Sequence, residues 1–408
     1  MLHLRNCLLP LLRAASPLPF PVHPHECRLL STSPSPSPAP FSLEDYLVAS
    51  CGLAPAQARE VSKKAFHELS RVYKRPLEEL SYCRLISASN PDAILDLLSG
   101  AGLSRADIAA AVSADPLLLR ASVKNIAPRL VALRDRVGLS TPQIAGFLLV
   151  GSLALRKVDV VPKLEFFISF YGSFEQVLVA AKKCKGLLTA SLERVIKPNI
   201  ALFRQWGVGE IARLCLEKPW VLTFNRERVK EVLLLAEELG VPTTSRMFRH
   251  AVAAVADISK EKVAAKLEFF KRTLCCSESE VLIAVSKMPK ILGLSDENIV
   301  RKIEFLINEA AMEPQYIVER PVLLSYSLEK RLVPRHYVMK VLQEKGLLNR
   351  NMRFSSLAVI GEETFKSKFI DCHMDSVPGL ADAYAAVRAA RKTNKCFMEA
   401  MQANAMML

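Results

Sequence analysis

The chain has 408 residues, and its 55 Lys and Arg against 41 Asp and Glu give a formal net charge of +14. Half of the residues are hydrophobic, which excludes disorder over the whole length. The longest nearly apolar run, residues 144–155, falls short of the roughly 20 residues that span a bilayer, so we expect no membrane insertion. The excess of basic residues indicates a polyanionic partner and leaves the fold open.

The first 40 residues have the composition of an organelle transit peptide followed by a Ser/Pro spacer. They hold three arginines and one acidic residue, and the stretch from Met1 to Ala15 can form a short basic amphipathic helix. Residues 31–40 lack the apolar side chains that a core needs. The isolated arginines favour a mitochondrial location. A chloroplast address is the alternative, and a tail without a targeting role is the third interpretation.

A period of about 34 residues, within the range of known helical repeats, runs through the rest of the chain. Glycines mark it at nearly constant spacing, at Gly102, Gly138, Gly172, Gly207 and Gly240, and Gly346 follows after three more periods. A second marker is a proline that opens a short apolar stretch, at Pro116, Pro219, Pro289 and Pro321. Because these markers stay in phase from the first glycine to the last, they indicate a helical repeat array.

Each repeat is predicted to contain two helices and a short turn. A further proline series (Pro128, Pro162, Pro198 and Pro334) starts or kinks the first helix, and the glycine ends it in a left-handed cap. Ser104, Thr141 and Ser277 are the expected N-caps of second helices, with Glu280 completing a capping box. The proline-leucine stretch then forms one turn packed into the core.

These patterns predict an all-α fold, an α-solenoid superhelix built from helical repeats of this period. We expect a helical lead-in at 41–90, about eight repeats at 91–348, and closing helices with a tail at 349–408. No segment shows a convincing period of two, the mark of a strand.

The sequence offers no catalytic or metal-binding constellation. The ten cysteines contain no CxxC pair, and no histidine stands at zinc-finger spacing from one. Phosphate loops and common hydrolase motifs are also missing. We therefore predict no catalytic residue, no metal, no cofactor and no enzymatic activity.

One combination of motifs resembles a known family. Ile126-Ala-Pro-Arg-Leu130 precedes Gly138-Leu-Ser140, and Pro-Leu-Leu follows in phase. This combination is similar to the mitochondrial transcription termination factor (mTERF) family, which is large in plants. The resemblance covers roughly residues 41–378, and the segment from Phe365 to Tyr384 is similar to the family's C-terminal closure. Departures are the proline-free repeat around residues 252–255, and Cys275 and Ala311, which stand near vacant glycine positions.

The resemblance implies a superhelix of three-helix units whose basic concave face holds nucleic acid. It also implies a role in organellar transcription termination or initiation, intron splicing or ribosome assembly. The expected partner is organellar nucleic acid, double-stranded DNA or RNA, together with other gene-expression proteins, and the protein is expected to be monomeric. The alternative is a protein-binding scaffold, because stacked helices offer a surface to any partner.

A groove for a polyanion needs cations that recur in phase. The position after the first-helix proline supplies them in most repeats, and an adjacent lysine stands in where asparagine occupies it. The predicted nucleic-acid-binding residues are Arg129, Lys163, Lys197, Lys266, Lys302 and Arg335. Their alternative role is the solvated face of an amphipathic helix. Further basic clusters lie at 182–185, 194–197, 226–230 and 330–335.

Overall fold

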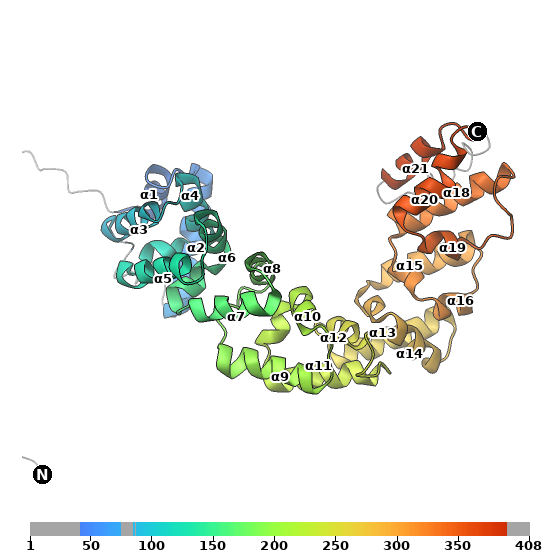
Figure 1. Ribbon diagram of the computed structural model, residues 1–408, viewed down its shortest axis with the longest axis horizontal. Helices are drawn as coiled ribbons and strands as arrows, with labels where there is room; N and C mark the ends of the chain where they lie inside the picture. Colours follow the sequence, from blue (N-terminus) through green and yellow to red (C-terminus); the bar gives the residue numbers. More distant parts are fainter. Residues whose placement is uncertain (1–40, 75–84, 86, 390–408) are drawn as a thin grey trace, which may run out of the picture. The chain divides into compact units, whose positions relative to one another are not determined.

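The computed structural model describes residues 41–74, 85 and 87–389. Every regular element in this part of the chain is an α-, 3-10 or π-helix, and no strand occurs in it (Figure 1). The predicted all-α helical-repeat fold is confirmed. The predicted transit peptide and the last residues of the predicted tail, 390–408, lie outside the described residues. Helices α1 (Leu43–Ala49) and α2 (Pro55–Tyr73) pack on each other before the first repeat.

The repeats alternate a first and a second helix. The first helices are α3 (Ser89–Gly100), α5 (Val123–Asp135), α7 (Val161–Tyr171), α9 (Lys197–Gln205), α11 (Arg226–Glu238), α13 (Lys260–Leu274), α15 (Asp296–Glu304) and α18 (Val333–Glu344). The second helices are α4 (Arg105–Ala114), α6 (Thr141–Lys157), α8 (Phe174–Lys183), α10 (Ile211–Glu217), α12 (Phe248–Val255), α14 (Glu278–Lys287) and α16 (Pro314–Glu319). Helices α19 (Phe354–Val359), α20 (Glu362–Phe369) and α21 (Leu380–Ala389) follow, with the 3-10 turn η8 (Asp371–His373) between the last two.

In neighbouring repeats, second helices pack on second helices and first helices pack on first helices. Helix α4 packs on α6, α6 on α8, α8 on α10 and α10 on α12, so the second helices form one layer. First helices pack in the same way in the pairs α3–α5, α5–α7, α9–α11 and α13–α15. Each repeat therefore buries its apolar face against the next one along the chain.

Short turns fill the space between the two layers. They are η2 (Pro116–Arg120), η4 (Pro219–Thr223), η5 (Pro289–Gly293) and α17 (Val322–Ser325). Their apolar residues are at most 2% exposed at Leu118, Leu222 and Leu324, which confirms the predicted core turn. Three first helices also contain or adjoin a π-helical turn: η3 (Leu192–Ile196), η6 (Phe305–Glu309) and η7 (Leu328–Leu332). In η3 and η7 the extra residue comes just before Pro198 or Pro334, where the proline ring obstructs the regular α-helical bond.

The glycine markers end first helices as predicted. All six have positive φ, between 71° at Gly207 and 94° at Gly172. The two residues at vacant glycine positions adopt the same backbone conformation, with φ of 50° at Cys275 and 48° at Ala311. The repeat therefore imposes a left-handed residue even where the sequence has lost the glycine that favours it.

Replacing Ala311 with glycine is expected to raise the free energy of unfolding by roughly 0.5–1 kcal/mol. The left-handed conformation costs an L-residue about 1–2 kcal/mol, and glycine avoids this cost. Glycine also loses more backbone entropy on folding than alanine, which offsets part of the stabilisation. Urea denaturation measures the change. The control is Ala310→Gly, because Ala310 has φ of −90° and should only lose stability. Equal effects of the two substitutions would contradict this explanation.

The N-caps of the second helices are confirmed at Ser104 and Ser277, each in a capping box. The prediction of Thr141 was wrong by one residue, since Ser140 is the N-cap of α6. With Ser140 as cap, Gln143 stands at the third helical position, and its Oε1 accepts from the Ser140 N–H at 3.0 Å. With Thr141 as cap, Ile144 would stand there and could not return the bond.

Candidate nucleic-acid interface

The side chains predicted to bind nucleic acid mostly point into their own repeat. Lys163 on α7 donates from Nζ to the carbonyl of Leu188, 2.9 Å away. Lys302 on α15 does the same to Leu324 at 2.7 Å. Leu324 is the last leucine of α17, and Leu188 is the last leucine of a turn at 185–189, so in both repeats the lysine joins the first helix to a turn of the same repeat.

Donors on other first helices also bond a carbonyl 22 to 31 residues further along the chain, which lies in or just after a turn, in α6 (Leu155) or in α19 (Leu357). We call this contact the turn clasp. Lys266 donates to the Leu294 carbonyl at 2.8 Å and also pairs with Asp296. Arg129 donates to the Leu155 carbonyl. Asparagine makes the contact through Nδ2, from Asn199 to the carbonyls of Leu222 and Phe224 at 3.0 and 2.8 Å. The clasp donors are Asn90, Arg129, Lys163, Asn199, Lys266, Lys302 and Arg335.

Arg335 makes the most extensive clasp, and its side chain is 0% exposed. Its guanidinium donates to the carbonyls of Leu357 at 2.8 Å, Ala358 at 3.2 Å and Ile360 at 2.5 Å. It also pairs with Glu362 at 3.0 Å. Burial alone would raise the pKa of Glu362, but hydrogen bonds from Arg335 and Tyr384 and the nearby arginine charges lower it overall.

The clasps therefore place most of the predicted site inside the repeats. Lys163 and Lys302 are 9% and 3% exposed, and burial lowers the pKa of both amines. Arg129 and Lys266 are half-buried. Lys197 differs, because it is exposed on α9 and pairs with Glu193 at 2.5 Å. Nucleic-acid contact by Arg129, Lys163, Lys197, Lys266, Lys302 and Arg335 stays a prediction.

A second group of cations forms hydrogen bonds between the second helices of neighbouring repeats. Lys183, at the end of α8, donates to the Leu216 carbonyl near the end of α10, 2.9 Å away. Lys287, at the end of α14, reaches the Glu319 carbonyl at the end of α16 at 3.4 Å. A cation is favourable there because the C-terminus of a helix carries partial negative charge. These lysines complete the stacking of the second helices.

A third phased set lies at the beginning of the first helices. The pattern Ser/Asn-x-Glu-Arg/Lys/Asn occurs at residues 191–194, 225–228, 259–262, 295–298 and 327–330. In each copy the Ser or Asn is the N-cap, and its side chain accepts the backbone N–H of the fourth residue. We call these fourth residues the first-helix row: Arg194, Arg228, Lys262, Asn298 and Lys330.

Helix stability does not explain cations at these positions. The N-terminus of a helix carries partial positive charge, which favours the preceding glutamate and disfavours Arg or Lys. At Glu261, for example, hydrogen bonds from its own backbone N–H and from Ser259 lower the pKa. Arg194, Lys262 and Lys330 are nevertheless exposed and form no ion pair within the described part of the chain. Arg228 is half-buried and donates to the Ile258 carbonyl at 3.3 Å.

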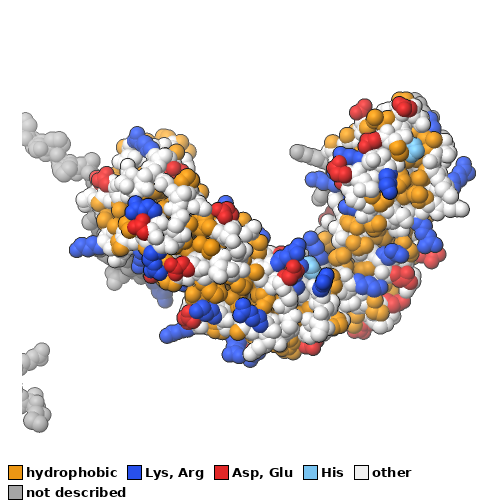
Figure 2. Space-filling view, in the orientation of Figure 1, with side chains coloured by type: hydrophobic (Ala, Val, Ile, Leu, Met, Phe, Trp, Pro, Cys, Tyr) orange, Lys and Arg blue, Asp and Glu red, His pale blue; other side chains and the backbone are white. Residues whose placement is uncertain are grey.

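Two cavities adjoin members of the row. Lys262 lines one of about 690 Å³ between α12, α13 and η5. Lys218 and Lys266 in this cavity pair with Asp257 and Asp296, whereas Lys262 and Lys290 have no ion pair among the residues described. Lys330 lines another cavity, of about 590 Å³, near the end of the described chain. Figure 2 shows Lys and Arg over much of the face in view, interspersed with Asp and Glu. Because the two signs are mixed on this face, a candidate binding site is better identified by the position of its cations than by the net charge of the chain.

Comparison with known proteins bears on the family. The family model for mTERF matches residues 175–366, from the start of α8 into α20. The chain is also similar to "Transcription termination factor MTERF8, chloroplastic" of Arabidopsis thaliana, with 21% identity over 83% of this chain and 64% of that relative. These findings support an mTERF family member.

Two further Arabidopsis thaliana relatives carry mTERF names. The chain is 22% identical to "Transcription termination factor MTERF15, mitochondrial" over 54% of this chain and 49% of the relative. It is 28% identical to "Transcription termination factor MTEF18, mitochondrial" over 23% of this chain and 17% of that relative. The chain thus spans 64%, 49% and 17% of the lengths of these three relatives.

The described residues contain neither a metal site nor a membrane-spanning helix. No group of three or more His, Cys, Asp and Glu side chains is arranged to hold a metal ion there. Among the helices of the same residues, none has the length and apolar character to cross a membrane.

Proposed function

We propose that this mTERF protein is an organellar nucleic-acid-binding regulator of gene expression, acting in transcription termination, transcription regulation or intron splicing. The names of its relatives support the gene-expression role. The first-helix row supports binding, because Arg194, Lys262 and Lys330 recur there as exposed cations, in register with the repeat, where helix stability disfavours them. Mitochondria are the proposed location and chloroplasts the alternative, and the relatives' names include both organelles.

The proposed contact is between row cations and phosphates. First helices pack side by side in the pairs α9–α11 and α13–α15, so their N-termini follow one edge of that layer. Lys197, one turn further along its helix than Arg194, can add to the same edge. We assign binding to the row rather than to the clasps because the clasp donors already bond backbone carbonyls in the absence of a ligand.

Raising the salt concentration from 50 to 200 mM is expected to weaken binding about 20-fold for single-stranded RNA and about 40-fold for double-stranded DNA. These figures follow from three phosphate contacts, by Arg194, Lys262 and Lys330, each releasing counterions. Fluorescence anisotropy of labelled oligonucleotides measures both affinities. Affinity that does not fall with salt would overturn the electrostatic mechanism.

A protein-binding scaffold is the second candidate, favoured by exposed apolar side chains on the second helices. Leu149 on α6, Val179 on α8 and Ile283 on α14 are 45%, 42% and 51% exposed. Helices α6 and α8 pack against each other, so two of these apolar side chains belong to adjacent helices. Binding of a protein partner to these side chains should survive charge reversal of the first-helix row, whereas binding of nucleic acid should not.

A further inference from the structure

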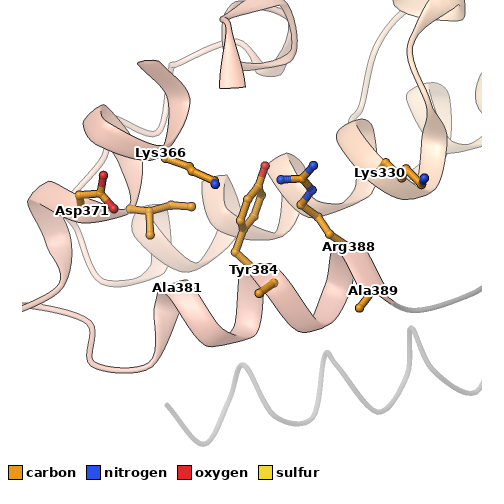
Figure 3. Close-up of a pocket in the computed structure, with 9 residues that line it drawn as sticks. Lys330, Lys366, Asp371, Ala381, Tyr384, Arg388 and Ala389 are labelled. Carbon is orange, nitrogen blue, oxygen red and sulfur yellow. The ribbon is translucent and has the colours of Figure 1, made fainter. Parts of the chain in front are cut away.

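The cavity that contains Lys330 is assembled from the last elements of the described chain, and we call it the C-terminal pocket. Lys330 comes from η7, Lys366 from α20, and Tyr384 and Arg388 from α21, while Asp371 of η8 and Ile370 also line it. Helix α21 packs on both η7 and α18, which brings these segments together. In Figure 3 the Lys366 amine and the Arg388 guanidinium lie on either side of the Tyr384 hydroxyl, with Lys330 beyond Arg388.

The charges of the pocket favour an anion. Three cations, Lys330, Lys366 and Arg388, line it against one acid, Asp371, which lies beyond Lys366 in the view of Figure 3. Neither Lys330 nor Lys366 has an ion pair among the described residues. The two amines are therefore not neutralised within the described part of the chain, although they share a cavity whose volume suits a small ligand.

The third cation, Arg388, is held in place by a half-buried network. Glu362 accepts from Arg388, from the Tyr384 hydroxyl at 3.0 Å and from Arg335 at 3.0 Å. The Arg388 guanidinium also lies 5.5 Å from the Tyr384 ring centroid. Its position is thus fixed before any ligand arrives, and a preorganised cation loses little freedom on binding.

We propose that the C-terminal pocket binds a phosphate group of a nucleic-acid strand that follows the first-helix row. Lys330 belongs to both features, since it is the last member of the row and the first cation of the pocket. A phosphate offers several anionic oxygens to cations that come from different elements. This inference rests on the proposed function for the identity of the strand, while a free nucleotide is the other source of the same group.

The test uses Lys366, which lines the pocket but does not belong to the row. Lys366→Glu is expected to weaken oligonucleotide binding about ten-fold at 50 mM salt, because a contact is lost and a repulsive charge is added. The matched control is Lys368→Glu, two residues further along α20 and outside the pocket, with an expected loss below about two-fold. Thermal unfolding of both variants checks the fold. Equal losses in the two variants would overturn the pocket while leaving the row untouched.

Isothermal titration calorimetry with pyrophosphate and with a mononucleotide distinguishes failure of the pocket proposal from failure of the proposed function. If the full chain binds no oligonucleotide, the proposed function fails, and saturable pyrophosphate binding that Lys366→Glu removes still supports the pocket. A mononucleotide that binds as tightly as the oligonucleotide would overturn the strand as the source of the phosphate. Absence of any binding of oligonucleotide, pyrophosphate and mononucleotide would overturn the pocket itself.

Discussion

Replacing Arg335 with leucine is expected to lower the free energy of unfolding by about 1–3 kcal/mol. The guanidinium is fully buried and satisfies the carbonyls of Leu357 and Ile360 together with the Glu362 carboxylate. Leucine can replace the packing, but the buried Leu357 carbonyl then loses its side-chain donor, whereas the Ile360 carbonyl keeps Arg331 and Glu362 keeps Tyr384 and Arg388. Buried acceptors without a partner carry a desolvation penalty of about 1–3 kcal/mol each.

Equilibrium urea denaturation of the full chain measures this loss. Arg335→Lys is the informative second variant, because lysine makes the clasp at Lys163, Lys266 and Lys302, and it should recover part of the stability. Lys330→Leu is the control, since an exposed neighbour without an ion pair in the described structure should change stability by less than about 0.5 kcal/mol. An Arg335→Leu variant as stable as this control would contradict the structural role of the clasp.

The triple reversal Arg194→Glu, Lys262→Glu and Lys330→Glu is expected to weaken nucleic-acid binding by at least about 100-fold at 50 mM salt. It removes three phosphate contacts and places three repulsive charges on one edge of the array. Thermal stability should stay unchanged or rise, because glutamate near a helix N-terminus is more favourable than Arg or Lys. Loss of binding together with retained stability would separate function from folding.

The matched control reverses three exposed cations outside the row. Arg204, at the opposite end of α9, is combined with Lys340 and Lys368, so the net charge falls by the same amount. Binding to this control should fall by less than about five-fold, since separated exposed charges are screened over roughly 10 Å. Equal losses in the two triple variants would show that only net charge matters.

Local chemistry in the sequence was enough to predict the backbone of each repeat. A glycine cap requires one residue with positive φ, and a capping box requires a serine and, three residues later, an acceptor side chain such as Glu, Gln or Asp. Both patterns involve only residues that are close together in the sequence, so they can be recognised without knowledge of the fold. The same reasoning identified Cys275 and Ala311 as occupants of glycine positions, and the structure gives both positive φ. The prediction of Thr141 as an N-cap was wrong because the choice between two adjacent cap residues depends on the residue at the third helical position.

The direction of the clasp side chains could not be predicted from helical periodicity. A lysine after the proline lies at the boundary of the apolar face, where a long side chain can turn toward solvent or inward. One signal was available, however. Asn199 occupies the same register as Lys163 and Lys266, and the property these residues share is hydrogen-bond donation rather than charge. That pattern favours a backbone acceptor over a phosphate.

The first-helix row could have been found from the sequence by aligning the N-caps. When the phase is taken from the prolines, Arg194, Arg228 and Lys330 fall into separate basic clusters. Those prolines stand further along the helix and are missing from several repeats. The cavities beside Lys262 and Lys330 depend on long-range packing, which a single sequence does not specify.

The turn clasp has a consequence for how such a chain can change length over generations. Donor and acceptor of each clasp are separated by less than one period of the repeat, so a duplicated or deleted unit carries both partners together. A gene could gain or lose a whole unit without leaving an unpaired buried amine at the junction. Substitution among lysine, arginine and asparagine keeps the bond, so each copy can then diverge at this position independently.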